Sequence, residues 1–167
     1  DADEMIRQGL KIKKWGKNIY VKIPVTNSKG KFSGKAIRYL SHKNVKLNIT
    51  AVYTVQQTIK IIRNLNKKTK SIISIFAGRM SDVGKDPVPI FKKCVKLSKK
   101  YNKIQILWAS TREPYNFIQA NQIGCDIITM PAGVIEKVLK FGKSFQSLTI
   151  DTVKKFLIDS EESNFKL

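Results

Sequence analysis

Residues Ile19–Val25 read IYVKIPV, an apolar run that a single lysine interrupts. A short apolar run of this kind, rich in Ile and Val, is typical of a strand that is buried in a parallel sheet. Residues 3–15 precede it with the spacing of an amphipathic helix, which Gly16 ends. A loop rich in glycine and lysine, residues 26–34, follows it. The order therefore predicts a helix, a strand and a loop that leads to a second helix.

Four more apolar runs repeat this arrangement along the chain. They are Val45–Tyr53, Ser71–Phe76, Ile104–Ala109 and Asp126–Thr129. We expect helices at about 35–42, 55–66, 88–101, 114–122, 132–141 and 151–159, the last beginning at Asp151. Thr54 and Gln57 have the spacing of a capping box. Alternating strands and helices predict parallel βαβ units, in either a doubly wound sheet or a barrel.

The chain of 167 residues carries 32 Lys and Arg against 12 Asp and Glu, a formal net charge of +20. Such a charge favours anionic partners, among them sugar phosphates and nucleic acids. The basic residues are spread along the chain and no nucleic-acid motif is present, so we expect no nucleic-acid partner. No apolar run approaches the roughly 18 residues of a membrane helix, so no membrane association is expected.

The two cysteines, Cys94 and Cys125, lie far apart and outside any metal-binding pattern. We expect reduced thiols, no metal site and a cytoplasmic location.

Lys22 is the most informative polar residue, because it interrupts an apolar strand. A buried lysine is costly unless it is paired or neutral. Desolvation favours the neutral amine, which is the form that attacks a ketone to give an imine. The ordinary alternative is a strand lysine whose ammonium group reaches solvent.

Further polar residues lie near the strand ends, where the side chains of a barrel converge. Asn48 and Thr50 share one face of their strand by alternation, as do Ser74 and Phe76. Two arginines from successive strand ends could hold one phosphate with the hydroxyl of a serine as a further donor. These three residues are Arg79, Arg112 and Ser110. The residues alone thus predict a parallel α/β enzyme with a candidate imine lysine and an anion site.

Five motifs resemble, in order and spacing, those of the transaldolase and fructose-6-phosphate aldolase family. They are YVKIPVT, LNITAVYT, SIFAGRMSDVG, LWASTREP and DIITMPAGVIEKVL. The resemblance implies a (β/α)8 TIM barrel that uses neither metal nor cofactor. It also implies carbohydrate metabolism of the pentose phosphate type, in which a lysine forms a Schiff base with a keto-sugar phosphate. A dihydroxyacetone unit then passes to an aldose phosphate.

The resemblance also assigns roles to single residues. It implies catalytic roles for Lys22, Asn48 and Thr50, and substrate-binding roles for Ser74, Phe76, Arg79, Ser110 and Arg112. Lys22 would form the imine, Asn48 would bond substrate hydroxyls, and Thr50 would lie near the catalytic water. Phe76 favours transfer over the lyase activity of a fructose-6-phosphate aldolase, whose branch tends to carry tyrosine there. That aldolase activity is the alternative.

The family lysine lies on the fourth strand of its barrel, whereas Lys22 lies on the first strand of this sequence. We therefore expect residues 1–167 to form the C-terminal five-eighths of a single barrel domain, with strands four to eight and their helices. Family residues that take part in proton transfer would lie on the first three strands. The chain alone is accordingly expected to be inactive, either as part of a longer enzyme or as a truncated remnant. Because the two outer strands of such a partial barrel would be unpaired on one side, a homo-oligomer is a further possibility.

Overall fold

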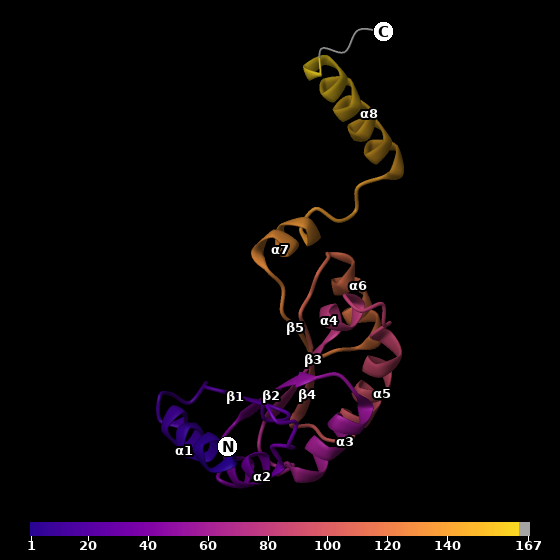
Figure 1. The fold of residues 1–167 in the computed structure, drawn as a ribbon. Helices are drawn as coiled ribbons and strands as arrows, with labels where there is room; N and C mark the ends of the chain where they lie inside the picture. Colours follow the sequence, from indigo (N-terminus) through magenta and orange to yellow (C-terminus); the bar gives the residue numbers. More distant parts are fainter. Residues whose placement is uncertain (164–167) are drawn as a thin grey trace.

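A computed structural model describes residues 1–163 of the chain. Its centre is a five-stranded parallel sheet in the order β1-β2-β3-β4-β5 (Figure 1). The strands are β1 (Val21–Pro24), β2 (Leu47–Val52), β3 (Ser71–Phe76), β4 (Ile104–Ala109) and β5 (Ile127–Ile128). The sequential order has no reversal of the kind that defines a doubly wound sheet. The fold is therefore part of a TIM barrel, as the sequence predicts.

One helix precedes the first strand, and at least one helix follows each strand. The helices are α1 (Ala2–Lys13), α2 (Gly34–His42), α3 (Val55–Asn64), α4 (Ala77–Ser81), α5 (Val88–Ser98), α6 (Tyr115–Ile123), α7 (Ala132–Val138) and α8 (Phe145–Glu162). The short helix α4 stands where the sequence predicted only a turn. The prediction that the last helix begins at Asp151 is wrong, because Ser144 caps α8 by accepting a hydrogen bond from the amide of Ser147. Asp151 lies inside the helix and pairs with Lys143.

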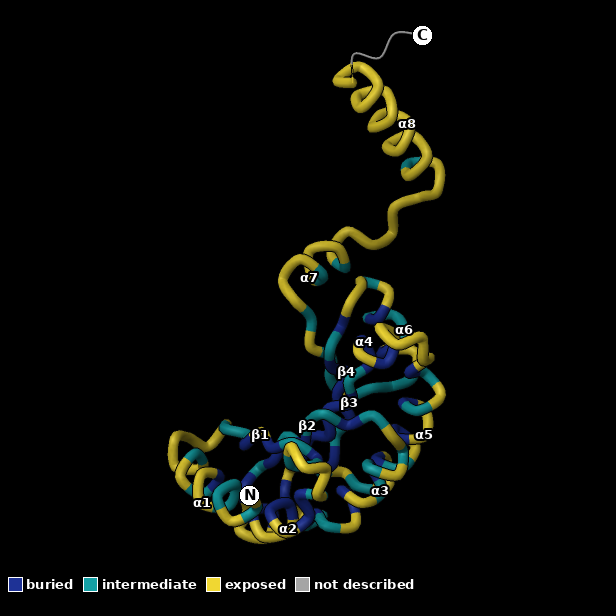
Figure 2. The backbone as a smooth tube through the Cα atoms, in the orientation of Figure 1, coloured by how far each residue is buried: buried dark blue, intermediate teal, exposed yellow. Residues whose placement is uncertain are grey.

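One face of the sheet forms the main core with the helices that cover it. Alternate residues of each strand point toward this face and are fully buried, among them Ile49, Ile73 and Ile106. Trp108 is also fully buried there and stacks on Phe91 with ring centroids 4.4 Å apart. The buried residues gather along the strands and the inner sides of α2, α3 and α5 (Figure 2). This packing fixes which strand residues point to the opposite face.

The opposite face of the sheet has only a small apolar cluster. Ile72, Leu107 and Ala109 are buried in it, and Tyr20, Phe76 and Ile127 pack against them. The strand β3 is therefore buried on both faces, as its continuous apolar pattern SIISIF indicates. The polar side chains predicted to form a site lie on this second face.

The predicted capping box at the start of α3 is confirmed. The amide of Gln57 donates to Thr54 Oγ1 at 3.1 Å, and the amide of Thr54 donates to Gln57 Oε1 at 3.0 Å. We expect Thr54→Ala to lower the free energy of unfolding by about 1 kcal/mol, because it removes an acceptor from a helix N-terminus. Urea denaturation measures this loss. Thr54→Ser keeps the acceptor and is the control; an equal loss in both variants would contradict the capping role.

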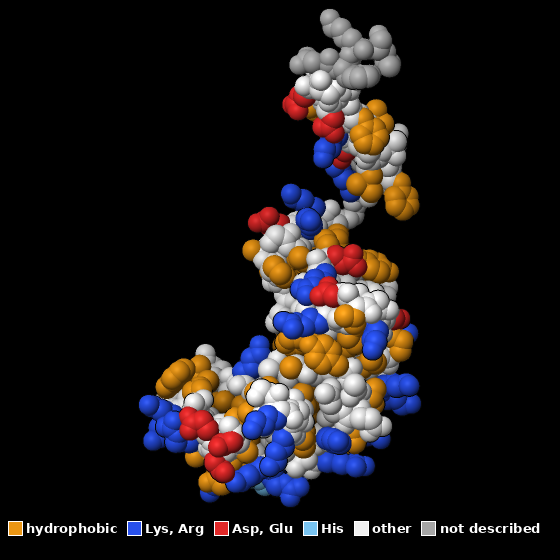
Figure 3. Space-filling model, in the orientation of Figure 1, with side chains coloured by type: hydrophobic (Ala, Val, Ile, Leu, Met, Phe, Trp, Pro, Cys, Tyr) orange, Lys and Arg blue, Asp and Glu red, His pale blue; other side chains and the backbone are white. Residues whose placement is uncertain are grey.

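Helices α7 and α8 extend away from the sheet (Figure 1). No residue of α8 is buried, although the helix carries large apolar side chains (Figure 3). Those exposed are Phe145, Leu148, Ile150, Val153, Phe156, Leu157 and Ile158. Within residues 1–163, no helix combines the length and the apolar character needed to cross a membrane.

Candidate functional site

A cavity of about 280 Å³ opens on the second face of the sheet, toward the C-terminal ends of the strands. It is lined by Lys22, Asn48, Ser74, Phe76, Arg79, Leu107, Ala109, Ser110, Arg112 and Thr129. The fold thus brings seven of the eight predicted site residues to one place, and only Thr50 is missing from the lining. The C-terminal ends of the strands are where barrel enzymes hold their active sites.

Lys22 reaches this cavity because its neighbours in β1 point the other way. Val21 and Ile23 are buried against the helices, so alternation turns Lys22 to the open face. Lys22 pairs in register with Asn48 of β2. The side chain of Lys22 remains exposed to solvent. Lys22 therefore lines the cavity from the open face of the sheet, but it is exposed to solvent rather than buried.

Asn48 is held by a neighbouring strand. The hydroxyl of Ser74 on β3 donates to Asn48 Oδ1 at 2.7 Å. With the oxygen of the amide occupied in this way, the amide nitrogen remains as a donor toward the cavity. Ser74 is itself almost fully buried, so the bond fixes the rotamer of Asn48. The pair can present an N–H group to an oxygen of a bound molecule.

Thr50 shares the partly buried face of β2 with Asn48, as alternation predicts, because Leu47 and Ile49 are the buried residues on either side of Asn48. The register between β2 and β3 shifts after Ile49, and Ala51 has a φ of 59°. The alternation is therefore interrupted at Ala51, the residue after Thr50. The hydroxyl of Thr50 is buried and has no hydrogen-bond partner among the described residues. Since buried polar groups normally have a partner, this hydroxyl could accommodate a water or a substrate oxygen.

The two predicted arginines meet in the cavity but differ in their partners. Arg79, on α4, lies with its guanidinium carbon 5.9 Å from the ring centroid of Phe76. Arg112 donates to both carboxylate oxygens of Asp82, from Nε at 3.1 Å and from Nη2 at 2.6 Å. The hydrogen bond from Arg112 lowers the pKa of Asp82, and the same bond raises the pKa of Arg112. A carboxylate thus occupies part of the anion site.

Asp82 and Thr129 were missed by reasoning from the sequence. Thr129 lies directly after β5, so the rule that strand ends converge could have found it. Asp82 is the residue after α4, a helix that the sequence did not predict, and its pairing with Arg112 joins two separate loops. No local pattern indicated that contact.

A glycine allows the arginines to come together. A Cβ atom built on Gly78 would lie 1.8 Å from the backbone oxygen of Ser110, a distance that no carbon and oxygen tolerate without movement. Ser110 has a positive φ of 63°, a backbone conformation that residues other than glycine rarely adopt. Helix α4 therefore packs directly against the backbone after β4. This close approach places Arg79 and Arg112 on the same cavity.

We expect Asp82→Asn to tighten the binding of inorganic phosphate by several-fold, because the competing carboxylate no longer neutralises Arg112. Since the pKa of Asp82 is lowered, the carboxylate stays ionised below its usual range, and its competition in the unmodified chain is lost only on further acidification. Titration calorimetry with phosphate near neutral pH measures the change. Asp86→Asn removes the same charge from the same loop and is the control. Weaker binding in Asp82→Asn would show instead that Asp82 positions Arg112.

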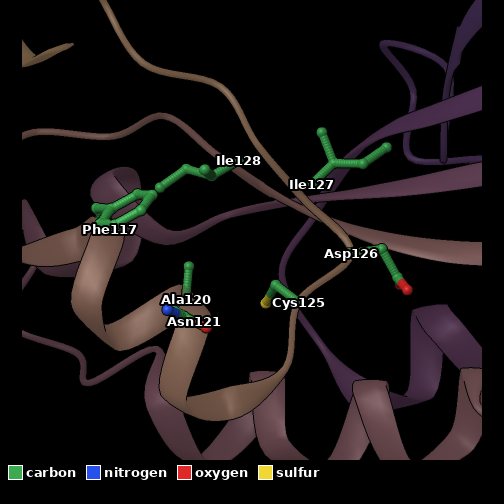
Figure 4. A pocket seen from close by; sticks show the side chains of 7 residues that line it. All are labelled: Phe117, Ala120, Asn121, Cys125, Asp126, Ile127 and Ile128. Atoms are coloured by element: carbon green, nitrogen blue, oxygen red, sulfur yellow. The ribbon is translucent and has the colours of Figure 1, made fainter.

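A second cavity, of about 290 Å³, lies between α6 and β5 (Figure 4). It contains the thiol of Cys125. Burial and the nearby charge of Asp126 raise the pKa of this thiol to about 12. The carboxylate of Asp126 accepts a hydrogen bond from the amide of Ile106 at 2.7 Å. A thiol that stays protonated is a poor nucleophile. In residues 1–163, no group of three or more His, Cys, Asp or Glu could hold a metal ion.

The fold and the cavity define a class: a parallel α/β barrel protein whose strand ends carry a lysine, an amide and two arginines. Over its whole length, residues 1–167, the chain matches the family model described as Transaldolase/Fructose-6-phosphate aldolase. The chain belongs to this family.

Several individual relatives are named as probable transaldolases. The chain is 33% identical over 162 residues to a probable transaldolase of Sulfurihydrogenibium sp. (strain YO3AOP1). This alignment covers 96% of the chain and 68% of the relative. The chain is 30% identical over 162 residues to a probable transaldolase of Herpetosiphon aurantiacus, with 96% and 67% covered. A probable transaldolase of Thermoplasma volcanium is 34% identical over 149 residues, with 89% and 63% covered. The chain thus spans about two thirds of the length of these relatives.

Proposed function

We propose that this chain carries the imine-forming part of a transaldolase-type enzyme. The observation that carries the proposal is the cavity in which Lys22 shares one opening with Asn48, Arg79 and Arg112. A lysine beside an amide donor and two guanidinium groups suits a substrate that has a ketone, hydroxyls and a phosphate. Membership of the transaldolase/fructose-6-phosphate aldolase family supports the same chemistry.

The proposed reaction begins when the amine of Lys22 attacks the ketone carbon of a keto-sugar phosphate. Loss of water gives a protonated imine, which acts as an electron sink. The carbon–carbon bond beyond the adjacent carbon then breaks, an aldose phosphate leaves, and a three-carbon enamine remains on Lys22. The enamine attacks the aldehyde of a second aldose phosphate, and hydrolysis of the new imine returns the free amine.

The other residues of the cavity bind and orient this substrate. The amide nitrogen of Asn48, held by Ser74, donates to a substrate hydroxyl. The unpartnered hydroxyl of Thr50 is assigned to the water that enters at hydrolysis. Arg79, Arg112 and Ser110 bind the phosphate, which competes with Asp82 for Arg112. A guanidinium pair binds a doubly charged phosphate more strongly than one carboxylate because more charge-assisted hydrogen bonds form.

We further propose that residues 1–167 are five of the eight βα units of one barrel domain. In the described sheet, β1 and β5 each pair on one side only, and Lys22 stays exposed to solvent. Three more βα units would pair both edges and exclude water from the amine. We therefore expect turnover only when such units are supplied.

Transfer is favoured over release of free dihydroxyacetone, because the ring of Phe76 lines the cavity without a hydroxyl that could act as a proton donor. Fructose-6-phosphate aldolase activity remains the alternative. The two are separated by assaying fructose 6-phosphate with and without an acceptor aldose phosphate. Cleavage that is equally fast without the acceptor would favour the aldolase.

Borohydride trapping tests the imine. The chain, extended by the N-terminal residues of the Sulfurihydrogenibium relative, is mixed with fructose 6-phosphate, reduced, and digested for mass spectrometry. We expect a single stable adduct on Lys22 among the 27 lysines of the chain. The same reduction without sugar is the control. An adduct spread over exposed lysines, or placed on a different one, would overturn the assignment.

A homo-oligomer also remains a prediction. The exposed apolar side chains of α8 favour it, because large apolar patches on a helix are normally covered. Light scattering coupled to size-exclusion chromatography measures the mass in solution. A monomer at all concentrations would contradict the prediction.

A further inference from the structure

The loops that lead into the strands gather lysines at the N-terminal edge of the sheet. In a parallel sheet every such loop returns to the same edge, so residues that are scattered in sequence come together. Four of the five loops that lead into the strands, residues 14–20, 43–46, 65–70 and 99–103, contain ten lysines and no Asp or Glu; the fifth loop, residues 124–126, has no lysine and carries Asp126. The ten lysines, called here the lysine edge, are Lys14, Lys17, Lys43, Lys46, Lys67, Lys68, Lys70, Lys99, Lys100 and Lys103.

The charge is therefore distributed unevenly between the two edges of the sheet. The opposite edge, where the candidate site lies, mixes its basic residues with Asp82, Asp86 and Glu113. Figure 3 shows an excess of Lys and Arg over the lower part of the molecule, with acidic side chains there confined to one patch. The expectation of no nucleic-acid partner depended on the dispersal of lysines along the sequence. In the folded chain, however, the topology brings many of these lysines to one edge of the sheet, so their dispersal along the sequence no longer argues against a nucleic-acid partner.

Few carboxylates lie at the lysine edge, since Asp126 is the one acidic residue in the five loops that lead into the strands. Four ion pairs occur in residues 1–163, and none includes a lysine of this edge. Some of its ammonium groups are instead held in place by the backbone: Lys46 Nζ donates to the carbonyl of Lys17 at 2.6 Å. That contact leaves the charge of Lys46 uncompensated by any carboxylate. An anion with several charges would satisfy this edge.

An aromatic ring stands among these lysines. Trp15 is 72% exposed and lies between Lys14 and Lys17 in the chain. The residues before and after Trp15 line a cavity of about 290 Å³, although Trp15 itself does not; the lining consists of Lys13, Lys14, Gly16, Lys17, Ile19, Asn44 and Lys46. Exposed tryptophan beside lysines is the combination that binds single-stranded nucleic acid, because bases stack on the ring while phosphates meet the ammonium groups.

We propose that the lysine edge and Trp15 bind single-stranded nucleic acid, with the phosphate backbone along the loops and a base stacked on Trp15. The ring favours this partner over an acidic protein surface, which offers charge but no flat π-face. A single strand is favoured over a duplex, whose bases are already stacked and cannot reach a surface ring. The lysine edge lies at the end of the strands opposite the candidate catalytic site, so the two sites act independently.

Fluorescence anisotropy with labelled twelve-nucleotide oligouridylate and oligothymidylate tests the proposal. If about four phosphates are neutralised, the logarithm of the binding constant should fall with the logarithm of salt with a slope of about −3. Trp108 is fully buried, so quenching of tryptophan fluorescence by the unlabelled oligomer reports on Trp15. The two oligomers separate RNA from DNA, and comparison with a duplex of the same length separates single-strand recognition from general attraction.

Two triple variants with the same net charge make the decisive comparison. Lys14→Glu, Lys17→Glu and Lys43→Glu change the lysine edge, whereas Lys60→Glu, Lys92→Glu and Lys137→Glu change exposed residues elsewhere. We expect at least about a tenfold loss in the first and less than about twofold in the second at ~0.1 M salt. Equal losses would reduce the binding to net charge and overturn the proposal.

The variant Trp15→Ala tests the stacked base. We expect affinity to fall by about tenfold, in line with ~1–3 kcal/mol per stacked base. Unchanged affinity, together with equal binding of the duplex or of polyglutamate, would overturn the proposal in favour of a nonspecific or protein-directed cationic surface. Trapping of the imine on Lys22 should be the same in all these variants, so the outcome does not depend on the proposed function.

Discussion

Replacing Lys22 with methionine should reduce turnover of a keto-sugar phosphate by at least about 10⁴-fold in the chain completed by N-terminal βα units, because the nucleophile is lost. Methionine has a similar length and apolar stem, so the strand should keep its packing. Lys22 is the only lysine among the residues that line the cavity, and no second amine can replace it there. Stopped assays of sugar-phosphate transfer measure the loss.

Lys29→Met is the matched control, since Lys29 is exposed in the loop after β1 and lies outside the cavity lining. Its activity should be unchanged. The circular dichroism spectra of both variants should match that of the unmodified chain. Residual activity above one tenth in Lys22→Met would exclude an imine at this residue, even if the protein still bound phosphate.

The second large effect is expected at Gly78. Gly78→Ala should lower the free energy of unfolding by about 3 kcal/mol, the cost of forcing an atom into a filled space. The added Cβ would lie 1.8 Å from the backbone oxygen of Ser110 and 2.8 Å from Cγ of Arg112. Phosphate binding should also weaken, because both neighbours line the anion site. Urea denaturation and calorimetry with phosphate measure the two effects.

Gly133→Ala provides the comparison for this prediction. Gly133 lies in α7, and an added Cβ there would meet no atom within 4 Å. Alanine in a helix is more favourable than glycine, so this variant should be as stable as the unmodified chain or slightly more stable. If Gly78→Ala were equally well tolerated, α4 would have to move freely against the end of β4, and the site geometry would not be fixed.

Much of the fold could be predicted because the strands are unambiguous. Ser71–Phe76 and Ile104–Ala109 match the predicted ranges residue for residue, since each is a continuous apolar run between polar turns. The helix α4 escaped prediction because its glycine and its short length indicate a turn. Its packing against Ser110 is a contact between distant residues, which no local pattern contains.

The same distinction holds for the site. Alternation from buried neighbours was enough to direct Lys22 and Asn48 to one face, and the structure brings them together. Alternation also directs Thr50 to the face of Asn48, but it ends at Ala51, whose positive φ interrupts the strand and has no signal in the sequence.

Because β3 is buried on both faces, the strands of the sheet should unfold locally in a definite order. The amides of β3 are bonded to β2 and β4 and lie beneath side chains on either side, so they should exchange with deuterium most slowly. The strand β1 pairs on one side only and should exchange earlier. Lys22 belongs to β1 and Ser74 to β3, so local fraying would separate the amine from its neighbours while the central strands still stand. Inactivation by mild denaturant should therefore precede the loss of the sheet.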